Sequence, residues 1–474
     1  MPFVRLHALS CLAALFAAAT ASAGDAPRVS GEPSRTPATK SLPAWRAAEV
    51  SEHAVARLRY GEMSAERILD LSRTNARGDA KRQAIGIGRT AASESVTGRL
   101  PSLRWVGLAD GSSVAQVEVT SPLAYGIRVG LAIDSLPQTA ELRFSGSARP
   151  RTIVATLRGD QVLSLLDSER VFWTPGTDGE TQRIELWIPA DSARETVRFS
   201  APGLSHLMTN PIDDFKILSD IGESGSCNIN AVCRVGLGQS YVNTKASVAK
   251  LTFVSGQFTY RCTGTLLNDT DAGTQIPYIH TAHHCISTQA EASTLNTYWN
   301  FESTTCGSDS LGQYTLLAGG ADFLYSNEPT DGALLRMREP APTGAVFAGW
   351  DANPLASGAS ITAIHHPQGD LKKVSLGTHT ATYTSQIEVG WLEGTTEGGS
   401  SGSAIFTSDS TSYYLRGGLH RGAASCANTG NLSNSGNYDI YSRFDVDFPS
   451  IRQYLYAPPA APVRRNGSQP LRPR

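Results

Sequence analysis

Three short stretches of the chain carry side chains that together can perform nucleophilic catalysis. Ser401 lies in "TEGGSSGSAIF", His284 lies in "YIHTAHHCIS", and Asp331 precedes the apolar run in "TDGALLRM". A serine hydroxyl becomes a strong nucleophile when a base removes its proton and a third group orients that base. These residue types therefore predict acyl transfer, in which Ser401 attacks a carbonyl, His284 carries the proton and Asp331 holds the imidazole tautomer.

Each stretch also has a structural interpretation when it is taken alone. Clusters of glycine and serine usually form loops, a histidine beside a cysteine can be structural, and Asp-Gly often marks a turn. The joint occurrence of all three in one cysteine-containing region favours catalysis. Gly399 fits this interpretation, because a residue without a side chain can bend to aim its N–H at a developing negative charge. The amides of Gly399 and Ser401 are the expected oxyanion hole, and one such donor is worth about 3–4 kcal/mol of barrier.

The region that must position these side chains is rich in strand-like segments. From residue 227 onward, short runs such as "SVAKLTFVS", "RCTGTLLN" and "SITAIHH" are separated by turn residues. Six of the seven cysteines also lie there, whereas Cys11 belongs to the N-terminal leader. An even number of cysteines in an exported chain predicts disulfides, although the count leaves their pairing open. The six are Cys227, Cys233, Cys262, Cys285, Cys306 and Cys426.

The N-terminus predicts export. Residues 1–23 combine Arg5, an Ala- and Leu-rich stretch and the small residues Ala21, Ser22 and Ala23, which is the layout of a cleaved signal peptide. A membrane anchor is the alternative, but the apolar stretch is short for spanning a bilayer. The expected location is therefore secreted and extracellular. The formal net charge of −2 gives no reason to expect nucleic acid or a membrane as a partner.

The chain upstream of residue 222 differs in character from the rest. Residues 24–45 are rich in Pro, Ser, Thr and Arg and are expected to be flexible, whereas residues 46–75 have the apolar spacing of a helix. From 82 to 200, short alternating segments predict an antiparallel β-sandwich, and no nucleophile–base grouping occurs in that sequence. This part is expected to be a pro-region or a module that binds carbohydrate or protein.

Taken together, the motifs resemble those of a known enzyme class. "TAHHC" and "GSSGSA" are similar to the histidine and nucleophile motifs of trypsin-like serine proteases, and "TDGALLRM" resembles the strand opening that carries their aspartate. The likeness is closer to the secreted bacterial lysyl endopeptidases, which "GSCNINAVC" and "GLHRGAASC" also resemble. It covers roughly residues 222–450, and the upstream segments "YGIRVGLAI" and "AELRFSG" resemble the pro-region of such enzymes.

This resemblance implies a mainly β chain with a defined order of parts. A signal peptide (1–23) and a pro-region with a β-sandwich-like segment (24–221) precede a protease domain of two six-stranded antiparallel β-barrels (222–457). Residues 458–474, rich in Pro and Arg, are expected to be a disordered tail. The pro-region is expected to act as a folding aid or inhibitor of the protease, with Lys216 as a self-processing site.

The resemblance also implies how the cysteines pair. The implied disulfides are Cys262–Cys285, Cys227–Cys426 and Cys233–Cys306. Glu397 stands where ordinary trypsin-like enzymes have a cysteine beside the pocket, so the bridge from the N-terminal segment is expected to replace the missing one. Ser400 stands where trypsin-like zymogens have an aspartate that captures a new N-terminal amine. That activating ion pair is therefore not expected here.

Asp439 is the candidate for substrate selection. "DIYSRF" resembles the strand that lines the substrate pocket, and a buried carboxylate there would favour Lys or Arg before the scissile bond. A surface aspartate is the alternative, because acids are common on surfaces. By resemblance, His420 lies on the strand that pairs with substrate backbone and is expected to line the cleft. Arg421 stands where relatives tend to have glycine, which is expected to disfavour basic neighbours in the substrate.

The sequence therefore predicts a secreted serine endopeptidase that acts on proteins or peptides and loses activity as His284 becomes protonated in acid. No metal or cofactor is expected, because the adjacent His365 and His366 have no acidic or cysteine ligands at metal-site spacing. Two alternatives remain: the same fold with a pocket for Glu or for small apolar residues, and a secreted binding protein that has lost catalysis. Asp439 argues against the first, and the intact set of three catalytic residues argues against the second.

Overall fold

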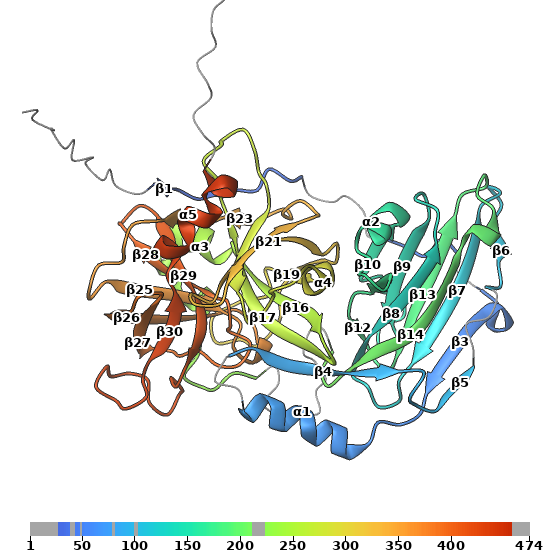
Figure 1. The fold of residues 1–474 in the computed structure, drawn as a ribbon, viewed down its shortest axis with the longest axis horizontal. Helices are drawn as coiled ribbons and strands as arrows, with labels where there is room; N and C mark the ends of the chain where they lie inside the picture. The colour runs from blue at the N-terminus through green and yellow to red at the C-terminus, as the bar shows by residue number, and fades with distance from the viewer. Residues whose placement is uncertain are drawn as a thin grey trace, which may run out of the picture.

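The computed structural model describes residues 27–37, 43–47, 50–77, 81–98, 103–210 and 223–456. The expected signal peptide, the C-terminal tail and Lys216 lie outside these residues. Strands dominate the described part of the chain, which forms two units placed side by side (Figure 1). None of the helices found in the described residues is long and apolar enough to cross a membrane.

The N-terminal unit is a two-layered β-sandwich. Its strands are β3 (Val55–Tyr60), β5 (Val96–Gly98), β6 (Val106–Gly107), β7 (Ser113–Thr120), β8 (Gly126–Ser135), β9 (Glu141–Gly146), β10 (Ala155–Arg158), β11 (Val171–Trp173), β12 (Thr177–Asp178), β13 (Thr181–Ile188) and β14 (Arg198–Leu207). One layer follows the order β10-β9-β13-β7-β3-β5, and β11, β8 and β14 form the other. Side chains of both layers meet in one core, where Val117, Ile184 and Val129 are fully buried. This is the sandwich that the alternating segments predict, except that β3 runs parallel to β7.

Residues 46–75, which the apolar spacing predicts to be helical, divide into two kinds of element. A 3-10 turn (η1, Glu52–Ala54) leads into β3, and α1 (Ala65–Arg77) follows after a short loop. In β3 the buried Leu58 and Tyr60 alternate with exposed arginines, which is the period of a strand. The helix prediction is therefore wrong for 55–60, because a short apolar run fits either period until its pairing partners are known.

The segment 27–37 is paired with distant strands, which corrects the expectation of a flexible lead-in. β1 (Arg28–Val29) pairs with β24 (Gly349–Asp351), and β2 (Glu32–Pro33) pairs with β23 (Val346–Phe347). Gly31, between them, passes so close that a Cβ would lie 2.7 Å from the Phe347 carbonyl oxygen. The described chain therefore lies against the C-terminal unit before it reaches the sandwich.

The C-terminal unit contains a closed barrel and a half-barrel. Its remaining strands are β15 (Ile229–Asn230), β16 (Val248–Ser255), β17 (Phe258–Leu267), β18 (Tyr278–Ala282), β19 (Asn296–Trp299), β20 (Thr315–Leu317), β21 (Ala321–Asn327), β22 (Gly332–Met337), β25 (Ser360–His365), β26 (Lys373–Thr382), β27 (Gln386–Glu393), β28 (Ala404–Ser408), β29 (Tyr413–Gly422) and β30 (Asp439–Ser442). The strands β25 to β30 are antiparallel and close on themselves, because β29 pairs with both β28 and β30. The half-barrel is built around β16, β17, β18 and β22. The expected arrangement of two β-barrel units is thus present. The second barrel is closed, and the first is a half-barrel among the described strands.

Helices are few in the described residues and lie outside the barrels. Besides α1 and η1, they are α2 (Gly159–Ser164), α3 (Gln239–Lys245), α4 (Gln289–Ser293) and α5 (Phe444–Leu455), with 3-10 turns η2 (Arg194–Thr196), η3 (Ala231–Leu237) and η4 (Pro367–Gly369). The helix α5 closes the C-terminal unit, because its Phe444 and Phe448 pack on the buried Trp350.

The strand β4 (Gln83–Thr90) joins the two units. It pairs with β14 of the sandwich on one side and with β17 of the half-barrel on the other, so a single twelve-stranded sheet runs through both. Figure 1 shows β4 running from one unit to the other with α1 alongside it. Leu71 of α1 is fully buried in the core that also contains Ile85 and Ile87 of β4.

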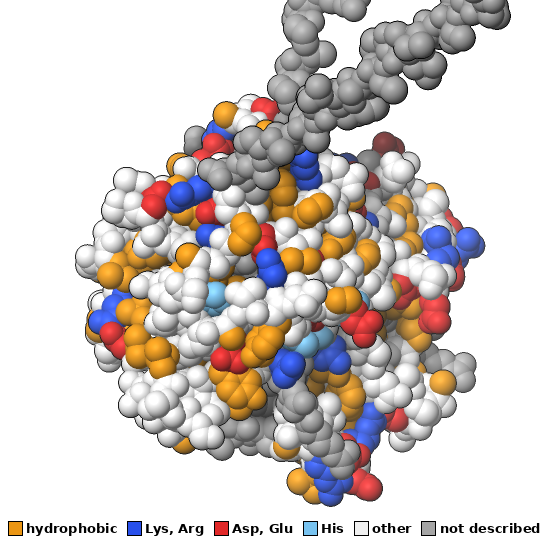
Figure 2. Space-filling view, turned by 60° about the vertical axis from the view of Figure 1, so that its left-hand side comes forward, with side chains coloured by type: hydrophobic (Ala, Val, Ile, Leu, Met, Phe, Trp, Pro, Cys, Tyr) orange, Lys and Arg blue, Asp and Glu red, His pale blue; other side chains and the backbone are white. Residues whose placement is uncertain are grey.

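Three disulfides stabilise the C-terminal unit. They are Cys227–Cys426, Cys233–Cys306 and Cys262–Cys285, which are the pairs implied by the resemblance. On the face shown in Figure 2, basic and acidic side chains are interspersed with apolar ones. That mixture agrees with the formal net charge of −2.

Candidate active site

His284, Asp331 and Ser401 come together between the half-barrel and the closed barrel. Ala282 at the end of β18 lies opposite Gly332 at the start of β22, so the loops that carry the histidine and the aspartate are neighbours. His284 Nδ1 lies 2.7 Å from Asp331 Oδ2, and His284 Nε2 lies 2.7 Å from Ser401 Oγ. The three residues expected from the sequence therefore form one hydrogen-bonded chain.

The carboxylate of Asp331 fixes both the ring and the backbone of His284. Besides the ring contact, Asp331 Oδ1 accepts a hydrogen bond from the His284 amide at 2.9 Å. Asp331 is buried and has a positive φ of 67°, which a non-glycine residue adopts only where its surroundings hold it. A carboxylate at Nδ1 selects the tautomer with the proton there, and this leaves Nε2 to accept the Ser401 hydroxyl proton.

Asp447 of α5 holds the loop that presents Asp331. Its Oδ1 accepts hydrogen bonds from Thr330 Oγ1 at 2.7 Å, Tyr325 OH at 2.9 Å and Asn327 Nδ2 at 3.2 Å. Burial raises the pKa of Asp447, and the charge of Asp331 adds to that rise. Sequence reasoning does not find this residue, because nothing in the sequence of a C-terminal helix links it to a loop more than 100 residues upstream.

The amides of Gly399 and Ser401 point at one carbonyl oxygen, that of Lys81. The Gly399 N–Lys81 O distance is 2.6 Å, and the Ser401 N–Lys81 O distance is 3.3 Å. Gly399 has a φ of +90°, and a Cβ there would lie 2.9 Å from the His366 carbonyl oxygen, so glycine is required for conformation and for space. Two N–H donors that converge on a carbonyl oxygen can stabilise a tetrahedral oxyanion.

The Lys81 side chain fills a pocket that contains Asp439. Its ammonium nitrogen lies 2.6 Å from Asp439 Oδ1 and 2.7 Å from Thr396 Oγ1. It also donates to the carbonyl oxygens of Thr396 at 2.9 Å and Ala424 at 3.1 Å. Because each of these partners offers an oxygen acceptor, the pocket is suited to a compact cation.

Asp439 is fully buried, with an exposed fraction of 0 %, and is surrounded by donors. Its Oδ2 accepts hydrogen bonds from the Trp391 indole at 2.7 Å and from the Thr396 hydroxyl at 2.6 Å. Burial raises the pKa of Asp439, and the Lys81 ammonium and these two donors oppose that rise. Since all three neighbours donate, the site holds the carboxylate in its ionised form, which is the form that attracts a cation.

His420 packs beside the imidazole of His284. Its ring centroid lies 5.6 Å from that of His284, and its Nδ1 lies 2.8 Å from Gln386 Nε2. The amide of Gln386 donates, so Nδ1 of His420 is the accepting nitrogen and Nε2 carries the proton. Burial lowers the pKa of His420, which keeps the ring neutral at neutral pH. The neighbouring Arg421 is exposed.

A chain of uncharged groups lies next to Ser401, and it begins at Ser400, where by resemblance no trypsin-like ion pair is expected. Ser400 Oγ lies 2.8 Å from His365 Nδ1, and His365 Nε2 lies 3.0 Å from Ser375 Oγ. The Ser375 hydroxyl in turn donates to the Thr395 carbonyl at 2.7 Å. Burial lowers the pKa of His365 to about 3, so the ring is neutral. These contacts tie the nucleophile loop to the pocket wall without a free N-terminal amine.

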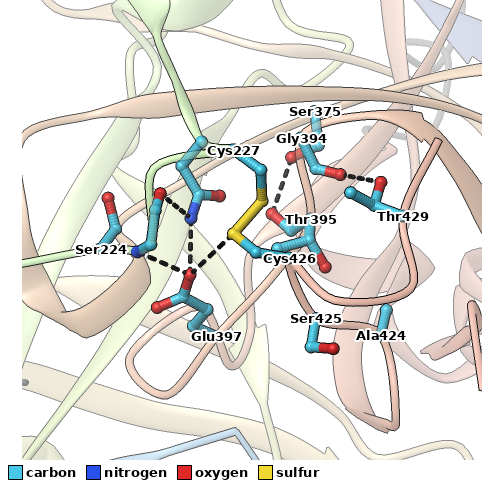
Figure 3. The surroundings of a disulfide bond; sticks show 12 residues. Ser224, Cys227, Ser375, Gly394, Thr395, Glu397, Ala424, Ser425, Cys426 and Thr429 are labelled. Atoms are coloured by element: carbon cyan, nitrogen blue, oxygen red, sulfur yellow. Dashed lines mark hydrogen bonds between the residues drawn. A yellow bond between two sulfur atoms is a disulfide. The ribbon is translucent and has the colours of Figure 1, made fainter.

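Glu397 and a disulfide anchor the segment that begins the C-terminal unit. Figure 3 shows Glu397 beside the Cys227–Cys426 bridge. Its Oε1 accepts hydrogen bonds from Gly225 N at 2.9 Å and from Asn228 Nδ2 at 2.6 Å. Glu397 thus binds the same segment that the disulfide holds, and the two together brace the loop next to the pocket.

Two groups of side chains in the described residues lie close enough to share a metal ion, and both include His284. One contains Cys262 and Cys285, whose sulfur atoms are joined in a disulfide, and the other contains Asp331 and His420. Both ring nitrogens of His284 already have hydrogen-bond partners. Neither group therefore offers a free set of ligands.

Sequence reasoning misses Lys81 and its neighbour Arg82. Lys81 and Asp439 are 358 positions apart, so no local pattern connects them. One local pattern could have pointed to Lys81 as a cleavage site. A Lys-Arg pair directly precedes the strand-like "QAIGIG" in a chain expected to cleave after lysine. The sequence favours Lys216 instead, because that residue lies near the expected end of the pro-region.

A closed antiparallel barrel, a half-barrel and a Ser–His–Asp chain between them define a serine protease of the trypsin-like class. Residues 221–442 match the family described as lysyl endopeptidase, C-terminal domain, and residues 59–208 match the lysyl endopeptidase N-terminal domain. The lysyl endopeptidase of Pseudomonas aeruginosa is 32% identical over 388 residues, which are 78% of this chain and 81% of that protein. The chain therefore belongs to the lysyl endopeptidase family, and it is a serine endopeptidase.

One solved structure is also similar. It is a thermostable serine protease, AL20, from an extremophilic microorganism, with 15% sequence identity and a TM-score of 0.30. The similarity covers 42% of this chain and 92% of the AL20 chain.

Proposed function

We propose that this chain is a secreted endopeptidase that hydrolyses peptide bonds after lysine through an acyl-enzyme on Ser401. One observation carries the proposal: a lysine ammonium is bound at Asp439 while the carbonyl oxygen of the same residue receives the amides of the nucleophile loop. A substrate residue just before a scissile bond must satisfy both contacts at once. The name of the Pseudomonas aeruginosa relative, lysyl endopeptidase, supports the same preference.

In the proposed mechanism, Ser401 Oγ attacks the substrate carbonyl carbon while His284 Nε2 takes the hydroxyl proton. Asp331 stabilises the imidazolium, and the amides of Gly399 and Ser401 stabilise the oxyanion. His284 then gives its proton to the leaving amine as the C–N bond breaks, which leaves an ester on Ser401. A water molecule attacks that ester with His284 as base, so that the new carboxyl group leaves and the serine is restored.

The proposed preference for lysine over arginine follows from the oxygens around the ammonium. Asp439 offers only Oδ1 to the substrate, because Trp391 and Thr396 already occupy its Oδ2. A guanidinium binds best to both oxygens of a carboxylate, whereas an ammonium needs only one. Arginine therefore loses its two-point contact in this pocket, and lysine does not.

The proposed organisation places residues 1–23 in a signal peptide, 24–221 in a pro-region, 222–457 in the protease domain and 458–474 in a tail. Three disulfides support export, because such bonds persist in oxidising compartments. The match of residues 59–208 to the family's N-terminal domain supports a separate unit in the pro-region. Its proposed role is to inhibit the protease, since it supplies the lysine that fills the pocket.

Cleavage of a peptide panel tests the proposed function. The peptides differ only in the residue before the scissile bond (Lys, Arg, Met or Glu), and Ser401→Ala is the control. We expect the fastest cleavage after Lys, slower cleavage after Arg, and a loss of kcat on the order of 10⁶-fold in Ser401→Ala. Equal cleavage after Met would discard Asp439 as the specificity element. No cleavage by a processed, disulfide-bonded sample would favour a binding protein.

A further inference from the structure

The residue that fills the lysine pocket belongs to this same chain and is followed by an ordinary peptide bond to Arg82. Its ammonium is at Asp439, and its carbonyl oxygen accepts the amides of Gly399 and Ser401. We propose that the Lys81–Arg82 bond is a substrate of the active site in the same chain and is the first bond that the enzyme cuts in itself. This inference rests on the proposed cleavage after lysine.

The leaving-group side of this bond is also held by the C-terminal unit. The Arg82 guanidinium donates to the His284 carbonyl oxygen at 2.7 Å and lies 4.3 Å above the Tyr260 ring. From the next residue onward the chain is a strand, in which Gln83 is paired with Arg261 of β17. The residues on both sides of the bond are thus held by groups of the active site, and cleavage requires such positioning.

The same contacts persist after the bond is broken. The new N-terminus at Arg82 directly precedes β4, which is paired with both β14 and β17. On the other side of the cut, the Asn75 side chain of α1 donates to the Ala84 carbonyl at 2.9 Å and accepts from the Ala84 amide at 2.8 Å. The amine therefore stays beside the ester, and re-formation of the peptide bond competes with hydrolysis. Such a substrate is cut slowly and acts as an inhibitor meanwhile.

Cleavage of the Lys81–Arg82 bond consumes one water molecule and needs no other reagent. Ser401 Oγ forms a bond to the Lys81 carbonyl carbon, the Lys81 C–Arg82 N bond breaks, and the hydroxyl proton passes through His284 to the Arg82 amine. Water then hydrolyses the ester, which gives a carboxyl group on Lys81 and restores the serine.

The uncut chain already has the groups that this step needs. The oxyanion donors point at Lys81 O, and Ser400 is held by His365 instead of by an N-terminal amine that cleavage would have to create. Only one lysine can occupy the pocket at a time. While Lys81 occupies the pocket, the bond after it is the one presented to Ser401, which places the cut after residue 81 first in the order of processing.

The test measures self-cleavage of the purified full-length chain by intact mass and N-terminal sequencing. The variants are Lys81→Gln, Lys81→Arg, Lys216→Gln and Ser401→Ala, with Arg59→Gln as a matched control because Arg59 is exposed on β3 of the sandwich. We expect a fragment that begins at Arg82 in wild type, Lys216→Gln and Arg59→Gln, at a rate independent of chain concentration. The fragment should form at least tenfold more slowly in Lys81→Arg and be absent in Lys81→Gln and Ser401→Ala.

A parallel assay separates this inference from the proposed function. Each sample is digested with an added metalloprotease to remove the sandwich unit and is then assayed on a Lys peptide. If the digested wild type cleaves the Lys peptide but the undigested chain never yields an Arg82 terminus, the inference is wrong and the proposed function stands. A rate that rises in proportion to chain concentration overturns cleavage within one chain. Absence of Lys-peptide cleavage in every sample overturns both. Lys81→Arg keeps the positive charge, so the test does not depend on the folding of Lys81→Gln.

Discussion

The two oxygens of Asp439 have different roles in the pocket. Oδ2 accepts hydrogen bonds from Trp391 and Thr396, which fix the carboxylate in place, and Oδ1 faces the bound cation. When the cation leaves, a buried charge loses its main partner, and a buried charge without a partner is costly. The pocket therefore gains most from a side chain that brings its own positive charge and least from a neutral one.

Substrate binding should depend on pH through Asp439. Burial raises the pKa of this residue, and loss of the Lys81 cation from the processed enzyme raises it further. Asp439 is charged only above its pKa, so the KM for a Lys peptide should rise as the pH falls, and this should begin above the pH at which an exposed carboxyl, with a pKa of about 4, titrates. The KM for an otherwise identical Met peptide should stay constant. Measurement of KM for both peptides across the acid range checks this.

Asp439→Asn is the control for that assignment. It should lower kcat/KM on the Lys peptide by about 30- to 4,000-fold, which corresponds to about 2–5 kcal/mol for loss of one partner of a buried charge pair. It should also abolish the pH dependence of KM. Asp309→Asn, at an exposed aspartate, should behave as wild type. If KM kept the same pH dependence in Asp439→Asn, another group would have to be responsible.

At the scale of elements, the loop before β22 positions Asp331, the proposed catalytic aspartate, and Asp447 of α5 positions that loop. Asp447→Ala leaves three donors without their acceptor and should lower kcat by about 10- to 100-fold, because small displacements of catalytic groups are costly. KM for the Lys peptide should change little, since the pocket lies on other strands. Steady-state kinetics of Asp447→Ala and Asp447→Asn check this. Asparagine keeps an accepting oxygen and should restore most of kcat, and an equal loss in both variants would contradict a positioning role.

The sequence is informative where function constrains short motifs and less so where distant pairing decides the structure. The loops of His284, Asp331 and Ser401 are recognisable because each has its own local pattern. By contrast, the helix prediction fails for residues 55–60, because their parallel partner β7 lies more than 50 residues downstream. The two-residue strands β1 and β2 are too short to show any period. Lys81 and Asp447 escape sequence reasoning for the same physical reason: their roles exist only after folding.

At the scale of the whole molecule, a single strand makes the sandwich and the protease unit one body. β4 is paired on both sides, and the Lys81–Arg82 bond just upstream of it lies at the amides of Gly399 and Ser401. The segment between α1 and β4 carries the lysine that fills the pocket, and β14 of the sandwich pairs with the strand that follows this segment. The segment 27–37 adds a second attachment through β1 and β2. Removal of inhibition should consequently require breakage of strand pairing and not only cleavage of one bond.

The accessibility of Ser401 reports this inhibition directly. A lysine-like phosphonate that labels the active serine must displace Lys81 from the pocket and from the oxyanion donors. Full-length wild type should therefore be labelled at least tenfold more slowly than full-length Lys81→Gln, whether or not the bond after Lys81 has been cut. Arg59→Gln, which removes a charge from the exposed face of β3, should be labelled as slowly as wild type. Intact-mass measurement of the labelling rates tests whether Lys81 blocks access to Ser401. Equal rates for wild type and Lys81→Gln would show that Lys81 does not block the site.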